Sequence, residues 1–392
     1  GTDRAHFAFT ASHQRIGSIP VTPLELLPPG QPRNNDFHEN WTYHGKFGAD
    51  LSENFSINFV ARYTDIDARF TEDSGWPSVP RPDQSKSTGR YFYGLSEAAW
   101  RLLDGRLNHR AGIAYTDVVR RSLTPGTSWS PFDGRHTKFF WKSDLKLAPA
   151  HTLVVGAERS EESARTSAIR ASTTNAGAYA ELQSAFSDRL FLTSNIRYDD
   201  HKTFGGHATW RLASAFLIPE TRTRLKASYG TAYYAPSLNQ LHDPNFGNPA
   251  LLPEESRGYD FGFEQSVFQG NLQFGATWFD NDIRNLITFA AAPPFPFINI
   301  NKAETHGVEA FIAAQLTDQL KLRADYTRTI AKDGTTGDFL LRRPKHKTSL
   351  TAIWQPTEAF TFSATALWVS GWYDYDRPGL AFPAFKTSGH TV

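Results

Sequence analysis

Alternation of apolar and polar residues with a period of two is the feature of this sequence that most constrains its fold. Phe55, Ile57 and Phe59 alternate with Ser56 and Asn58, and the same pattern recurs within 107–115, 190–198, 225–233, 272–278, 320–326 and 360–368. Successive side chains of a β-strand point to opposite faces, so this period predicts strands with one apolar face. Strong helical periodicity is hard to find, and we expect an all-β fold.

The connections between these segments alternate in length. Each segment has about 10–14 residues, which a tilted strand needs to cross a bilayer. Short turns are predicted near 52–53, 104–105, 149–150, 187–188, 219–220, 269–270, 317–318 and 356–357. Longer polar connections span roughly 18–38, 66–88, 120–135, 160–174, 199–206, 234–256, 280–301, 330–342 and 371–385. This layout favours an up-and-down membrane barrel over a sandwich, whose strands are shorter, or a propeller, whose blades repeat.

Membrane crossing in this chain requires a closed sheet. No run of eighteen apolar residues is present to form a spanning helix, and the mean hydropathy is −0.46. In hydrocarbon every backbone polar group must be paired, so strands cross only as a closed barrel. Aromatic residues make up 14 % of the chain. Those near segment ends are expected in the two aromatic girdles of such a barrel: Tyr43, Tyr63, Trp100, Tyr115, Tyr198, Tyr229 and Trp354.

The strand count predicts a partial barrel. Counting a pair of strands per short turn gives about 17 complete strands, and another begins near Phe385 and stops at Val392. Finished bacterial barrels have an even number of strands. We therefore expect residues 1–392 to form an antiparallel transmembrane β-barrel domain that lacks its first and last strands.

Composition excludes several classes of function. Lys and Arg number 41 and Asp and Glu 40, a net charge of +1, which gives no support to nucleic-acid binding. The chain has no Cys, which rules out disulfides, zinc–thiolate sites and thiol nucleophiles. No hydrolase, metalloprotease or nucleotide-binding motif is present, so we expect no enzyme. A hydrolase at the barrel rim, using His136, His201 or His207, stays an alternative.

Two groups of residues are candidate binding sites. Asp65, Asp67 and Asp73 belong to an acidic cluster at the end of a predicted strand, which is either a calcium site or a solvated rim paired with arginines. No other cofactor is expected. Aromatic residues in the long connections are candidates to hold a large planar ligand, or else to pack within their own loops: Trp76, Trp129, Phe295, Phe297, Trp372, Tyr373 and Tyr375.

Five short motifs carry a family resemblance. YGT at 229–231, APS at 235–237 and NPALLPE at 248–254 follow one another within a single stretch and are counted together as one motif. Other motifs lie at 197–201, 279–287, 301–309 and 340–347. This set, in this order, resembles the TonB-dependent outer-membrane receptor family and, within it, most closely the cobalamin-receptor branch. The motif loop includes Asn248, Pro249, Pro253 and Glu254, and its prolines are expected to stiffen the turn from strand to loop.

The resemblance implies an active-transport receptor in the outer membrane of a Gram-negative bacterium. Such a receptor takes up a large, scarce nutrient, cobalamin or a ferric siderophore, and is driven by TonB through a plug domain inside a barrel of about 22 strands. The plug and its TonB box are not in these 392 residues. We expect a monomer in contact with lipopolysaccharide and outer-membrane lipid. A passive porin-like channel is the alternative function.

Overall fold

The computed structural model describes residues 1–2, 4–74, 79–290, 294–374 and 385–391. Nearly all of the regular structure is β-strand, with one short α-helix, α1 (Leu238–His242), and two short 3₁₀ turns, η1 (Leu24–Leu26) and η2 (Phe268–Gly270). No helix in the described residues is both long enough and apolar enough to cross a membrane. The strands are β1 Ala5–Ile19, β2 Asp36–Ser52, β3 Phe55–Ser74, β4 Val79–Leu102, β5 Leu107–Leu123, β6 Ser130–Ala148, β7 His151–Thr166, β8 Arg170–Phe186, β9 Leu190–His201, β10 Gly205–Ile218, β11 Thr223–Tyr234, β12 Glu254–Val267, β13 Leu272–Phe289, β14 Phe297–Thr317, β15 Leu320–Asp333, β16 His346–Thr357, β17 Phe360–Asp374 and β18 Phe385–Thr391.

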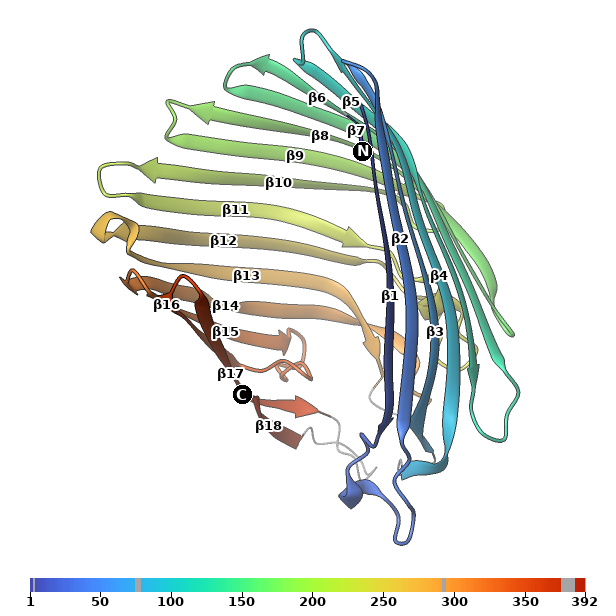
Figure 1. Ribbon diagram of the computed structural model, residues 1–392. Helices are drawn as coiled ribbons and strands as arrows, with labels where there is room; N and C mark the ends of the chain where they lie inside the picture. The colour runs from blue at the N-terminus through green and yellow to red at the C-terminus, as the bar shows by residue number, and fades with distance from the viewer. Residues whose placement is uncertain (3, 75–78, 291–293, 375–384, 392) are drawn as a thin grey trace.

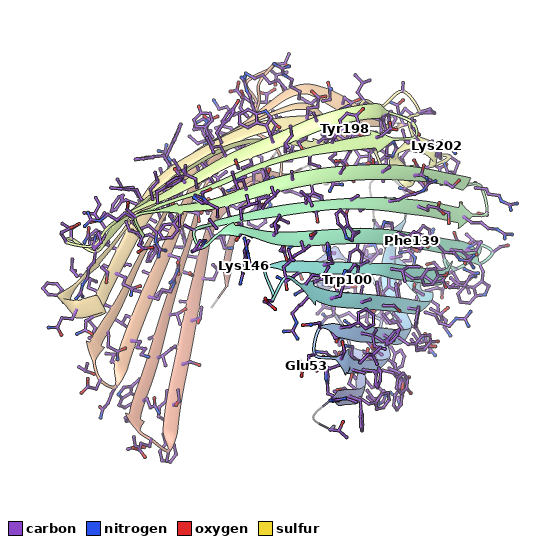
Figure 2. The ribbon with its side chains drawn as sticks, turned by 90° about the horizontal axis from the view of Figure 1, so that it is seen from above. Glu53, Trp100, Phe139, Lys146, Tyr198 and Lys202 are labelled. Atoms are coloured by element: carbon purple, nitrogen blue, oxygen red, sulfur yellow. The ribbon has the colours of Figure 1, made fainter. Side chains whose placement is uncertain are left out.

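The strands form one 18-stranded antiparallel sheet in which each strand pairs with its neighbours in sequence. Figure 1 shows this sheet as a strongly curved wall, and Figure 2, seen from above, shows it as an open arch. In the described part of the chain β1 and β18 do not pair with each other, so the barrel is not closed. The predicted fold, seventeen long strands and a short eighteenth in an antiparallel barrel wall, is confirmed.

Apolar side chains of this sheet are exposed on one face instead of being buried in a core. Phe9 is 68 % exposed, Phe261 58 % and Phe360 62 %, whereas no large side chain in the described residues is fully buried. We call the face that bears these rings the outer face. The alternate residues of the same strands, such as Asp260 and Glu264 of β12, accept hydrogen bonds from polar groups of β11 on the inner face. This arrangement suits a wall with hydrocarbon outside and water or protein inside.

Tight turns occur where the sequence predicts them. β2 ends at Ser52 and β3 begins at Phe55, and the other seven predicted turns lie between strands in the same way. In the turn after β4, Leu103, Asp104 and Gly105 all have positive φ. Turns of this handedness match the right-handed twist of the two strands they join. All eight turns lie at one end of the wall, which we call the short-turn end.

The strands extend further than the expected 10–14 residues. β3 and β4 have 20 and 24 residues and occupy most of 66–88, which was expected to be a connection. Only 167–169 separate β7 from β8, where a connection over 160–174 was expected. The extensions of β7 and β8 are almost entirely polar and show no period-two signal. They are strands because the neighbouring strand supplies hydrogen-bond partners, which the local sequence does not show.

Candidate functional site

A network of paired charges covers the inner face of β6 to β9. The Glu158 carboxylate accepts hydrogen bonds from Lys138 Nζ at 2.6 Å and from Arg197 Nη2 at 2.7 Å. Arg197 also donates to Asp199 at 2.6 Å, and Asn175 Nδ2 donates to Asp199 at 2.8 Å. The residues come from four adjacent strands and share one face because β-strand side chains alternate. The network is internally neutralised, so this wall presents paired charges to the lumen.

The segment that follows β11 closes a cavity against this network. Residues 234–238 cover a space of about 460 Å³ that is also lined by Asn175, Asp199 and His201. The His201 ring lies 3.2 Å from the Thr173 hydroxyl and stacks on Phe204. The buried side-chain oxygen of Asn175 has no hydrogen-bond partner among the described residues. A buried polar atom without a protein partner is a place for water or for a polar ligand atom.

Helix α1 holds this segment in place. Ser237 Oγ accepts a hydrogen bond from Gln240 N at 3.2 Å, and Gln240 Oε1 accepts one from Ser237 N at 2.8 Å, which is a complete capping box. Leu238 and Leu241 are buried where α1 contacts β7 and β8. The chain therefore crosses the inner face from β11 to β7 before it returns to form β12.

Asn248 and Pro249 of the motif loop lie where the chain turns back toward the sheet. Asn248 Nδ2 donates to the backbone oxygen of Phe297 at 2.9 Å, and Asn248 Oδ1 accepts from Ala250 N at 2.9 Å. Phe297 N in turn donates to the backbone oxygen of Phe246. Asn248 thus joins the loop to the first residue of β14.

Pro253 and Glu254 attach the other end of the loop to β13. Glu254 Oε1 accepts from Ile287 N at 2.7 Å, and the Pro253 oxygen accepts from Asn285 Nδ2 at 3.2 Å. Asn299 contributes two further side-chain hydrogen bonds to Leu252. In this geometry the motif residues position the loop through backbone contacts. The sequence motif points to the loop but does not show which strands hold it.

The aromatic ligand candidates lie in separate places at the end of the wall opposite the short turns. Phe297 stacks on Phe289 with ring centroids 4.2 Å apart, and Phe246 packs edge-on against Phe289. Tyr373 stacks instead on Phe339, 5.7 Å away. Trp129 is 45 % exposed in the loop between β5 and β6, Phe295 lies in the loop between β13 and β14, and Trp372 is on β17. Trp76 and Tyr375 lie outside the described residues.

Phe246, Phe289 and Phe339 were not singled out from the sequence. Lys345 Nζ lies 3.8 Å from the Phe339 ring centroid, and Lys332 lies over the same ring at 5.2 Å. Lys332 and Phe339 meet because the end of β15 pairs with the loop that follows it. The sequence shows only a basic segment that contains an aromatic residue, which does not by itself predict this contact.

The acidic cluster of β3 has contacts within the protein. Asp67 lies 3.3 Å from Lys86 Nζ, and Asp65 accepts a hydrogen bond from Tyr63 at 3.4 Å. Asp73 also has an interaction partner. Within the described residues, no group of three or more His, Asp or Glu side chains is arranged to hold a metal ion. Calcium binding by Asp65, Asp67 and Asp73 stays a prediction.

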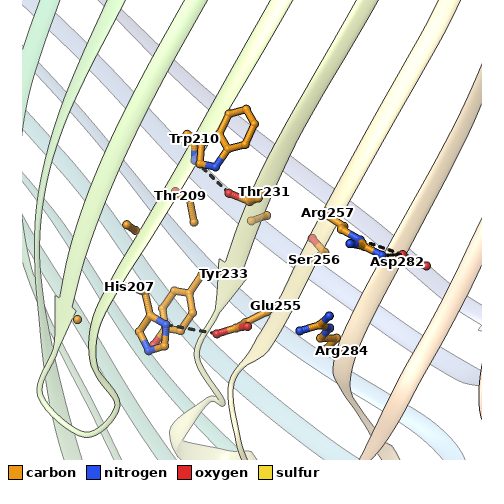
Figure 3. A pocket seen from close by; sticks show the side chains of 13 residues that line it. His207, Thr209, Trp210, Thr231, Tyr233, Glu255, Ser256, Arg257, Asp282 and Arg284 are labelled. Atoms are coloured by element: carbon orange, nitrogen blue, oxygen red, sulfur yellow. Dashed lines mark hydrogen bonds and ion pairs between the residues drawn. The ribbon is translucent and has the colours of Figure 1, made fainter.

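A second cleft opens on the outer face between β10 and β11 (Figure 3). The ladder between these strands begins where Ile218 pairs with Thr223 and has its last pair at Arg211 and Gly230. The neighbouring ladders, between β9 and β10 and between β11 and β12, continue to the ends of their strands. The cleft has a volume of about 400 Å³. The His207 and Tyr233 rings stack across it with centroids 3.9 Å apart, and Glu255 lies 3.7 Å from His207 Nδ1.

Comparison with known proteins connects this wall to characterised transporters. The family model described as TonB dependent receptor-like, beta-barrel matches residues 2–392. Vitamin B12 transporter BtuB of Vibrio vulnificus strain YJ016 is 24 % identical over 380 residues, which cover 94 % of this chain and 59 % of that protein.

Two solved structures share the fold. A ferric enterobactin receptor (PfeA) mutant from Pseudomonas aeruginosa matches with a TM-score of 0.81 and 18 % identity, covering 99 % of this chain and 66 % of that one. The siderophore receptor PirA from Acinetobacter baumannii matches with a TM-score of 0.80 and 13 % identity, covering 99 % and 64 %.

These relatives are named as transporters and receptors, and the resemblance to the TonB-dependent receptor family inferred from the motifs is confirmed. The match to BtuB agrees with the likeness of the motifs to the cobalamin-receptor branch. The chain spans about three fifths of the length of the BtuB relative. With the family model matched from residue 2 to residue 392 on a wall of eighteen antiparallel strands, this chain belongs to the TonB-dependent receptor family as its β-barrel.

Proposed function

We propose that the protein containing this chain is a TonB-dependent receptor of the Gram-negative outer membrane, and that it takes up cobalamin or a ferric siderophore. The match of the barrel family model to residues 2–392 carries this proposal. The BtuB and siderophore-receptor relatives support the two substrate classes, and none of the relatives compared supports a passive porin.

The wall is suited to an outer-membrane location. Its outer face bears exposed rings such as Phe261, and its inner face bears paired charges such as Lys138 and Glu158. In this proposal the short-turn end faces the periplasm and the opposite end, with its longer connections, faces the outside of the cell. Ligand capture then takes place at the end that carries Trp129 and the motif loop.

The inner wall is also suited to a domain that moves inside it. Glu158 and Asp199 both have their charge partner, Arg197, within the wall. A plug domain carried elsewhere in the protein can therefore shift without leaving wall carboxylates unpaired, which would be costly in a water-poor lumen. TonB pulling on that domain would open a path along β6 to β9.

Exposed aromatic side chains are the proposed ligand contacts. Trp129 stands 45 % exposed in its loop, whereas Phe297 and Tyr373 already stack on other rings. An exposed indole has a free face on which a flat macrocycle or catecholate ring can stack. Trp129 is therefore the first residue to test, and the other aromatic candidates follow it.

The test is uptake by cells that make the full-length protein in place of their own receptors. Labelled cyanocobalamin and labelled ferric enterobactin are supplied separately, with TonB present and with TonB deleted. We expect one label to accumulate only with TonB present. We also expect Trp129→Ala to weaken that uptake, while Trp354→Ala, at the short-turn end, leaves it unchanged. Uptake that persists without TonB, or ion conductance through the purified protein in planar bilayers without an energy source, would establish the passive channel instead.

A further inference from the structure

A row of aromatic rings marks a level on the outer face of β10 to β13. Trp210, Tyr229, Tyr259 and Trp278 follow one another across four strands, with ring centroids 5.1, 6.3 and 5.3 Å apart. Each of these rings is 37 % or more exposed. Such rows lie at the boundary between hydrocarbon and headgroups in membrane barrels. The apolar residues of β12, among them Phe261, lie on the short-turn side of the row.

The outer-face cleft begins directly beyond this row. Arg257 is two residues and Glu255 four residues beyond Tyr259 on the same face of β12. At about 3.3 Å per residue and a strand tilt of about 40°, this places the cleft roughly 5–10 Å outside the row. The headgroup layer of a bilayer is about 5–7 Å thick on each side. The cleft therefore lies at the depth of lipid headgroups.

The cleft exposes backbone groups that a complete ladder would use. Trp210 N donates to the Thr231 hydroxyl at 3.0 Å in place of a carbonyl of β11. Gly206 and Ala208 have the same parity as Trp210, so their N–H groups also face β11, yet β10 and β11 have no ladder pair at these positions. Backbone N–H groups and hydroxyls at the floor of a cleft are donors for an anion.

One cation in the cleft is not committed to a carboxylate. Arg257 donates to Asp282 at 2.9 and 2.7 Å, and Glu255 lies against His207. Arg284 lines the cleft beside Glu255 (Figure 3), but in the described part of the chain it makes no ion pair. A guanidinium that is free at headgroup depth has the fork geometry that binds phosphate oxygens.

We propose that this cleft binds a phosphate monoester of the outer-leaflet glycolipid, the lipid A part of lipopolysaccharide, with Arg284 as its principal contact. The inference rests on the outer-membrane location in the proposed function, since only there does the cleft face phosphorylated lipid. Arg257 and the N–H groups of Gly206 and Ala208 complete the donor set. Glu255 repels the phosphate and sets the strength of binding.

Two variants test the assignment in opposite directions. Arg284→Gln removes the charge and the fork, and we expect phosphate-bearing lipid to bind about tenfold more weakly, the usual effect of losing one charge-assisted contact. Glu255→Gln removes the repulsion and is expected to strengthen binding. Arg135→Gln is the matched control, because Arg135 lies on the outer face of β6, four strands away from β10, where it pairs with Asp117 at 2.8 Å.

The measurement is native mass spectrometry of the full-length protein purified from outer membranes in detergent. Wild type and the three variants are titrated with bis-phosphorylated lipid A, with dephosphorylated lipid A and with inorganic phosphate, after heat-modifiable migration has shown that each variant is folded. We expect adducts of phosphorylated lipid A that weaken in Arg284→Gln, strengthen in Glu255→Gln and stay unchanged in Arg135→Gln.

Three results would overturn the assignment. Equal lipid adducts in wild type and Arg284→Gln would remove Arg284 from the site. Equal binding of dephosphorylated lipid A would show apolar contact alone. Binding of inorganic phosphate as strong as that of lipid A would show a site for free phosphate. Nutrient uptake is measured in the same strains. If the lipid A adducts fail as described while TonB-dependent uptake is intact, the lipid site is refuted and the proposed function stands. If uptake is lost while the lipid A adducts are intact, the proposed function is refuted and the lipid site stands.

Discussion

Replacement of Asn248 by alanine separates a structural role of the motif loop from a ligand-contacting one. The change removes the hydrogen bonds of the Asn248 side chain to the Phe297 oxygen and to Ala250 N. Each such bond contributes about 0.5–1.5 kcal/mol net, and Asn248 is only half-buried, so the loop should lose about 1–2 kcal/mol. The rest of the sheet keeps its ladders and should be unaffected.

Native-state hydrogen exchange of the full-length protein measures this loss locally. A loss of 1–2 kcal/mol raises the opening equilibrium about 5- to 30-fold, and backbone amides of 246–252 should exchange faster by that factor. Asn245→Ala is the matched control, because the Asn245 side chain makes no hydrogen bond among the described residues of the same loop. Unchanged exchange in Asn248→Ala together with weaker nutrient binding would refute the structural interpretation and make Asn248 a ligand contact.

Two further predictions concern charge pairs. Arg197→Met leaves two half-buried carboxylates of the inner wall without their shared partner and should lower the free energy of unfolding by about 2–4 kcal/mol, measured with urea in lipid vesicles. Arg159→Met, the control, breaks an exposed pair and should lower it by less than about 1 kcal/mol. Equal losses in the two variants would contradict the buried network. Glu220 lies in the turn 219–222, and its carboxylate accepts hydrogen bonds from its own backbone N–H and from Arg189. These two contacts, the backbone one first, lower the pKa of Glu220 below its usual 4.5. The stabilisation is therefore present above pH 4.5 and lost as pH falls through the lowered pKa, and Arg189→Gln should raise the Glu220 pKa in an NMR titration.

Strand positions and tight turns were predictable because both are local. The alternation of Phe55, Ile57 and Phe59 is a property of consecutive residues, and the outer face of β3 carries these side chains as expected. Turn residues such as Asp104 and Gly105 act over three or four positions. The order of the wall then follows, since each strand pairs with its neighbour in sequence.

The outer ends of the strands were not predictable in the same way. The connection expected over 160–174 is almost entirely β7 and β8, because their pairing, for example Ser163 with Ser172, supplies hydrogen bonds to residues without an apolar pattern. The motif block at 248–254 was recognised, but its attachment to β13 and β14 was not. These contacts join residues 33 and 49 positions apart, so the sequence near each residue carries no signal for them.

The class of the fold, the positions of the strands, the tight turns and the family can all be predicted from the sequence, because they depend on short-range periodicity and on short motifs. Which charges meet, and where the wall opens, depends on contacts between strands and is seen in the three-dimensional structure. Lys138, Glu158 and Arg197 form one network because register aligns three separate strands. The cleft beside Arg284 exists because the β10–β11 ladder ends at Arg211 while both neighbouring ladders continue. The register of two strands, and the point at which their ladder ends, depend on how all the strands of the sheet pair, so they cannot be predicted from one segment of sequence.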